Sequence, residues 1–116
     1  MKSILGIEEL NNTLWELHNL NKVIVLYFGA TWCGPCKELK KRIEENHDEI
    51  PNLGLCYIDV DESENEELIN RYKVTSLPSL VFIKILQNGD EATIEECGRV
   101  DGYDWIKFLM EYQKNC

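Results

Sequence analysis

The sequence predicts an α/β fold, and three features indicate it. First, residues 22–29 form a continuous β-branched and aromatic run, which is typical of a strand buried on both faces of a partly parallel sheet. Second, a helical pattern over about 34–49 separates this run from another apolar run at 53–60, and a strand, a helix and a strand in succession imply a right-handed crossover. Third, Asn88-Gly89 is the strongest short hairpin signal in the chain.

The N-terminal part predicts a brief strand at 3–6 and then an amphipathic helix over 7–20. The helix prediction rests on apolar residues that recur at three- and four-residue spacing, with glutamates between them. These apolar residues are Ile7, Leu10, Leu14, Leu17 and Leu20.

The second half of the chain predicts a helix that starts with acidic residues near its positive end and turns Leu68, Ile69 and Tyr72 inward. Two strands joined by the Asn88-Gly89 turn and a closing amphipathic helix follow it. In order, the predicted elements are a helix from Asp61 onward, a loop at 74–78, strands at 79–86 and 92–97, an interruption at Gly98 and a helix over 102–113.

Composition limits the classes of protein to which the chain can belong. Its 116 residues are enough for one domain, 1–116, with a single core. A net charge of −9 argues against nucleic acid or an anionic membrane as a partner, and indicates a solvated acidic surface or one that steers a basic partner. The sequence has neither a signal-peptide pattern nor an apolar run of the ~20 residues that span a bilayer. We therefore expect a reducing compartment, the cytoplasm.

The segment Trp32-Cys33-Gly34-Pro35-Cys36 places two thiols where the first long strand meets its helix. Unpaired backbone N–H groups and the helix dipole favour a thiolate at Cys33, which makes it the better nucleophile. Three residues of helix separate the two Cα atoms by roughly 5 Å, within the range that a disulfide requires. Gly34 lets a substrate backbone approach, Pro35 gives up a donor that a helix start can spare, and Trp32 adds an apolar flank.

A Cys-x-x-Cys pair also forms half of a zinc site, which needs further ligands elsewhere in the chain. The remaining candidates stand isolated in the sequence: Cys56, Cys97, Cys116, His18 and His47. The spacing therefore favours a redox pair and no metal. The odd number of cysteines, five, argues against a secreted disulfide framework.

Several motifs make the chain resemble the thioredoxin family over nearly its whole length. They are Ala30 to Lys37 around the cysteine pair, Ile58-Asp59-Val60-Asp61, Val74 to Leu80, and Gly98 before a closing helix. The resemblance implies the thioredoxin fold, a central mixed sheet of four to five strands flanked by four helices. It also implies that the Leu77-Pro78 bond is cis and faces the cysteines.

The resemblance and the chemistry together predict a protein-disulfide reductase that needs no cofactor. Cys33 attacks a substrate disulfide and Cys36 resolves the mixed disulfide. The predicted substrate-contact residues are Trp32, Gly34, Pro35, Leu77, Pro78 and Gly98. The family also implies disulfide-containing protein substrates, a flavin-dependent reductase as electron donor and a monomer. Two alternatives stay open: a disulfide isomerase or oxidase, and an interaction subunit with incidental cysteines.

The chain departs from the family pattern beside the cysteines. Tyr27 stands where relatives carry a buried aspartate, and we place the lysine that pairs with this aspartate at Leu55. A phenol titrates near ~10, so Tyr27 is a poor base at neutral pH. Cys36 is then activated by water or by a nearby carboxylate, Asp59 or Asp61, unless these two only cap the strand and the next helix.

A second departure is Gly29, which replaces a tryptophan of many relatives and predicts a smaller surface beside the site.

Overall fold

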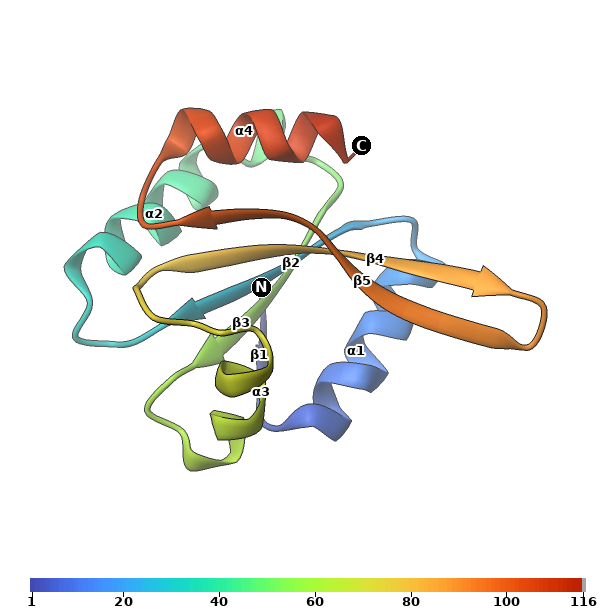
Figure 1. Cartoon of the computed structure of the whole chain (residues 1–116). Helices are drawn as coiled ribbons and strands as arrows, with labels where there is room; N and C mark the ends of the chain where they lie inside the picture. Colours follow the sequence, from blue (N-terminus) through green and yellow to red (C-terminus); the bar gives the residue numbers. More distant parts are fainter. Residues whose placement is uncertain (116) are drawn as a thin grey trace.

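The computed structural model describes residues 1–115, in which a central sheet carries helices on both faces (Figure 1). In chain order its elements are β1 Lys2–Ile4, α1 Ile7–Asn19, β2 Val23–Gly29, α2 Gly34–Glu45, a 3₁₀ turn at His47–Glu49, β3 Leu53–Asp59, a 3₁₀ turn at Ser63–Asn65, α3 Glu66–Arg71, β4 Ser79–Asn88, β5 Glu91–Asp101 and α4 Trp105–Lys114. Within this part of the chain, no helix has the length and apolar character needed to cross a bilayer.

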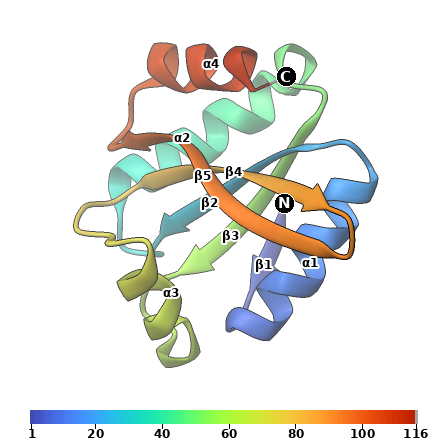
Figure 2. The same cartoon turned by 45° about the vertical axis from the view of Figure 1, so that its right-hand side comes forward.

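The sheet has five strands in the order β1-β3-β2-β4-β5. Strands β1, β3 and β2 are parallel to one another, whereas β4 is antiparallel to both β2 and β5. This arrangement confirms the predicted mixed sheet flanked by four helices, and places the first cysteine just beyond β2, a central strand (Figures 1 and 2).

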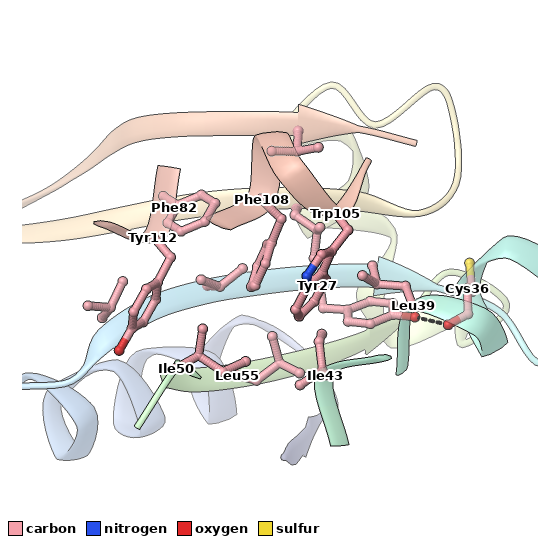
Figure 3. Packing of buried hydrophobic residues seen from close by; sticks show 14 of the residues in the cluster. Tyr27, Cys36, Leu39, Ile43, Ile50, Leu55, Phe82, Trp105, Phe108 and Tyr112 are labelled. Carbon is pink, nitrogen blue, oxygen red and sulfur yellow. Dashed lines mark hydrogen bonds between the residues drawn. The ribbon is translucent and has the colours of Figure 1, made fainter. Parts of the chain in front are cut away.

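Each face of the sheet has its own apolar core. Helices α2 and α4 cover one face and α1 and α3 cover the other (Figure 1). Alternate residues of β2 point to opposite faces, so Tyr27 packs under α2 and α4 while Phe28 packs toward α1 and α3. Figure 3 shows the first of these cores, which contains Leu39 and Ile43 of α2 and Phe108 of α4.

The helix that follows the cysteines is shorter than predicted. We expected it to run to residue 49, but α2 ends at Glu45 and a separate 3₁₀ turn follows. The side-chain amide of Asn46 donates to the Arg42 carbonyl oxygen at 2.8 Å, and so supplies one of the last carbonyls with a partner that ends the helix. The helix predicted from Asp61 onward is also divided, because the 3₁₀ turn at Ser63–Asn65 precedes α3.

The predicted interruption at Gly98 is wrong, because β5 runs through this residue to Asp101. Phe82 of β4 pairs with Gly98 but Ile83 pairs with Glu96, so Cys97 is the extra residue of a bulge. Because the extra residue interrupts the alternation of side chains along the strand, the sequence does not show one continuous strand here. The hairpin is longer than expected, and Figure 1 shows its tip extending beyond the helices.

The closing helix begins at Trp105 rather than at residue 102. Gly102 has a φ of 90°, which no helical residue adopts, and Asp104 caps the helix by accepting the N–H of Lys107 at 3.1 Å.

Candidate active site

The first cysteine begins the helix, as the sequence predicts. Cys33 is the N-cap of α2, and its Sγ atom accepts the backbone N–H of Cys36 at 3.2 Å. The structure joins the two cysteines in a disulfide with their Cα atoms 5.2 Å apart. Pro35 lies in the first turn, where its missing N–H leaves no acceptor unpaired. The helix start therefore supplies a fixed donor and a positive dipole end to the sulfur that must become a thiolate.

The two cysteines face different hollows of the surface. Cys33 lines a groove of about 610 Å³, hereafter the Cys33 groove, whereas Cys36 lines a cavity of about 290 Å³, the Cys36 cavity. Both side chains are nearly buried, with 6% and 3% exposure. An incoming substrate in the groove therefore meets Cys33 first.

The Cys33 groove contains part of the predicted contact surface. Trp32, Gly34, Pro35 and Leu77 line it together with Cys33. Pro78 and Gly98 do not line the groove: Pro78 is buried, and Gly98 lies within β5, where a side chain would collide with the Glu111 carboxylate. Sequence reasoning missed five further lining residues: Val60, Ile69, Val74, Thr75 and Ser76. Four of them carried a signal, because Val60, Val74, Thr75 and Ser76 belong to motifs that carry the family resemblance, whereas Ile69 lies within α3 and outside those motifs.

The loop after α3 approaches the cysteines through a cis peptide bond between Leu77 and Pro78, as predicted. Leu77 lines the groove, and the Pro78 carbonyl oxygen accepts the N–H of Gly102 at 2.7 Å. The loop therefore forms one wall of the groove while its last residue is bonded to the turn after β5.

Trp32 is held to one side of the groove by an acidic residue. Its ring is 67% exposed, and its indole N–H donates to Asp61 Oδ2 at 2.7 Å. Asp59 in turn accepts the backbone N–H of Asp61 at 2.9 Å. Neither Asp59 nor Asp61 lines the Cys36 cavity, so the structure does not bring these carboxylates to the resolving cysteine.

Tyr27 reaches the second cysteine from below. Its buried hydroxyl donates to the backbone carbonyl oxygen of Cys36 (Figure 3). Burial, and then the neighbouring Tyr57 phenol, raise the pKa of Tyr27 above its ordinary value. The phenol therefore stays protonated at neutral pH and fixes the helix backbone instead of accepting a proton from Cys36.

The residue that pairs with Tyr27 on the neighbouring strand is Tyr57. Leu55 pairs with Val25 in the β2–β3 ladder, whereas Tyr27 pairs with Tyr57. The two rings meet edge to face, with centroids 5.4 Å apart and an interplanar angle of 71°. A pair of phenols thus lines the Cys36 cavity.

We expect Tyr27→Phe to leave the pH profile of disulfide reduction unchanged and to lower the free energy of unfolding by about 0.5–1.5 kcal/mol, the usual net contribution of one hydrogen bond. Stopped-flow reduction between pH 5 and 9 and urea unfolding measure the two effects. Tyr57→Phe is the matched control, since it removes the same hydroxyl from the neighbouring ring. A displaced pH profile in Tyr27→Phe alone would show that this hydroxyl takes part in proton transfer.

Cys56 and Cys97 lie away from the groove. Cys56 is buried within β3, and burial raises the pKa of its thiol to about 12. Cys97 is half-buried at the β5 bulge, and burial again raises the pKa of its thiol. Both stay protonated at neutral pH and are poor nucleophiles. Cys116 lies outside the described residues. Among residues 1–115, no three His, Cys, Asp or Glu side chains gather to hold a metal ion.

Comparison with known proteins gives one consistent family. A family model described as Thioredoxin matches residues 7–108. The chain is similar to thioredoxin-1 of Drosophila melanogaster, with 45% identity over 65 residues, which cover 55% of this chain and 59% of that protein. It is also similar to thioredoxin-1 of Caenorhabditis elegans, with 41% identity over 69 residues, which cover 60% of this chain and 56% of that protein. The matched segment therefore spans just over half the length of these curated relatives.

Solved structures match over the full length. A thioredoxin of Fasciola hepatica superposes with a TM-score of 0.74 and 30% identity, covering 100% of both chains. The germline-specific thioredoxin Deadhead of Drosophila melanogaster superposes with a TM-score of 0.76 and 31% identity, again over 100% of both chains.

Proposed function

We propose, because this chain belongs to the thioredoxin family, that it is a thiol–disulfide oxidoreductase that reduces disulfide bonds in proteins. One observation carries the proposal. The Cys33 sulfur accepts an N–H group at the start of α2 and lines the groove, while Cys36 lies within disulfide distance on its other side.

The reaction proceeds in two exchanges. The Cys33 thiolate attacks one sulfur of the substrate disulfide, which forms a mixed disulfide and releases the other substrate sulfur as a thiolate that takes up a proton. The Cys36 thiolate then attacks Cys33 Sγ, releases the second substrate thiol and closes the Cys33–Cys36 disulfide. Two electrons pass from the protein to the substrate. Water in the Cys36 cavity is our candidate for the acceptor of the Cys36 proton, since none of the described residues that line that cavity carries a carboxylate.

Substrates are disulfide-containing proteins that present an extended segment to the groove. Trp32, Gly34, Pro35 and Leu77 supply a mostly apolar contact, whereas Pro78 and Gly98 do not line the groove. Exposed backbone in the Leu77 loop pairs with the substrate chain as an added strand, which depends little on substrate sequence.

The oxidised protein regains electrons from a flavin-dependent reductase, so the cycle needs no cofactor of its own. We place the protein in the cytoplasm as a monomer that transfers electrons to keep other proteins reduced. The Gly34-Pro35 dipeptide between the cysteines resembles reducing members of the family more than oxidising ones.

Insulin reduction with dithiothreitol, followed by turbidity, tests the activity against dithiothreitol alone. The reduction potential, measured against glutathione, separates the reductase from an isomerase or oxidase. We expect about −270 mV for a reductase, whereas about −120 to −180 mV identifies the alternative. No acceleration of insulin reduction would leave only an interaction subunit with this fold.

A further inference from the structure

The loop that forms one wall of the Cys33 groove is attached at both ends to a single strand. This groove loop, residues 74–78, runs from the end of α3 to β4 and has no regular secondary structure. Four of its five residues line the groove: Val74, Thr75, Ser76 and Leu77. Its conformation therefore decides how a substrate chain can lie beside Cys33.

The first end is held by a guanidinium group from β5. Arg99 Nη1 donates to the carbonyl oxygen of Tyr72 at 2.6 Å, and Nη2 donates to that of Lys73 at 3.2 Å. These carbonyls lie at the C-terminal end of α3, where backbone acceptors lack helical partners and the dipole is negative. Bonds from a charged donor to such acceptors are stronger than neutral ones.

The second end is held through Asp101, two residues further along β5. Its Oδ1 atom accepts Arg99 Nε at 3.0 Å and lies 3.1 Å from the Ser79 hydroxyl oxygen. That hydroxyl also lies 2.7 Å from the Ser76 carbonyl oxygen, so its single proton serves one of the two acceptors at a time. One guanidinium and one carboxylate thus connect both ends of the groove loop.

The arrangement requires the shape of arginine as well as its charge. The side chain is 23% exposed, and its planar fork points three N–H groups at acceptors from two elements, with Glu96 as a further partner at 3.3 Å. A lysine ammonium in this place cannot span the same acceptors.

We propose that Arg99 and Asp101 are positioning residues that hold the groove loop ready for a substrate chain, so that they govern capture of protein disulfides and not the sulfur exchange itself. This inference rests on the proposed reductase function. Neither residue lines the groove or lies beside the cysteines, which separates their action from the chemistry at Cys33.

Arg99→Lys tests the proposal with two substrates, insulin and the small aromatic disulfide dithionitrobenzoate. We expect KM for insulin to rise roughly tenfold, which is near the lower limit for losing a charge-assisted hydrogen bond, with little change in kcat. The rate with dithionitrobenzoate stays unchanged, because this disulfide reaches Cys33 without an extended chain. It also reports how much protein is folded and active. Arg71→Lys, on the exposed side of α3, is the matched control and leaves both rates unchanged.

Ser79→Ala loosens the other end of the groove loop and keeps the shape of a buried residue, so it should raise KM for insulin in the same direction. Equal losses on both substrates, or none on either, would overturn the positioning role while leaving the reductase function intact. A wild-type protein that reduces neither substrate would instead contradict the proposed function.

Discussion

Cys33→Ser is expected to abolish insulin reduction, whereas Cys36→Ser is expected to keep the first attack and to accumulate a mixed disulfide. A serine hydroxyl stays protonated at neutral pH, so loss of the Cys33 thiolate removes the nucleophile and lowers the rate by more than about 10³-fold. Loss of Cys36 removes only the resolving sulfur. The substrate then remains bound through Cys33, whose Sγ atom lines the groove.

Non-reducing mass spectrometry measures this difference directly. The Cys36→Ser protein should gain the mass of a substrate chain, and dithiothreitol should release it. Cys97→Ser is the control, because the Cys97 thiol is half-buried, away from the groove and protonated at neutral pH. A mixed disulfide formed through Cys36 in the Cys33→Ser protein would reverse the assigned order of attack.

Gly29→Ala is expected to lower the free energy of unfolding by about 1–3 kcal/mol, the usual cost of overpacking a core. A Cβ atom at this position would lie 2.8 Å from Tyr27 Cε1, 3.1 Å from Tyr57 Cε1 and 3.5 Å from Cys36 Sγ. The Tyr27 ring cannot swing away, because it is buried and its hydroxyl is bonded to the Cys36 carbonyl. Urea unfolding of the oxidised protein measures the loss.

A double-mutant cycle identifies the ring as the cause. In a Tyr27→Val background the Cε1 atom is absent, so Gly29→Ala should cost markedly less than it does alone. Gly34→Ala is the matched control, since a Cβ atom there meets nothing within 4 Å. Additive losses in the cycle would mean that position 29 is restricted by something other than Tyr27.

These contacts connect the two departures from the family pattern. The sequence presented Gly29 as a smaller surface beside the site, but the Tyr27 ring occupies the space that a side chain at position 29 would need. The large residue at 27 and the glycine at 29 are therefore linked by packing.

Local patterns were enough to predict most of the fold. The apolar run at 22–29 became the fully buried strand β2, and Asn88-Gly89 connects β4 to β5 as predicted. The cysteine pair could be placed at a helix start because strand and helix signals meet there, and the structure has Cys33 as the N-cap of α2. Each of these features is decided within a few residues of sequence.

Features that depend on strand register could not be predicted in this way. The pairing of Tyr27 with Tyr57 is one of them, because a shift of two residues along β3 leaves the apolar pattern of a buried strand unchanged. The bulge at Cys97 carries no hydrophobic signal, so the predicted strand stops at residue 97, whereas β5 continues to Asp101. Arg99 lies 26 and 27 residues from Lys73 and Tyr72, whose carbonyl oxygens it binds, and nothing local in the sequence connects them.

The separation of the two sulfurs has a kinetic consequence. Cys33 faces the groove and Cys36 faces the other cavity, so a chain bound through Cys33 does not cover the sulfur that must displace it. Release is then a unimolecular event within one molecule, driven by the high local concentration of a tethered thiol. The lifetime of a captured substrate is accordingly a property of this protein and is insensitive to the amount of free thiol in the surroundings.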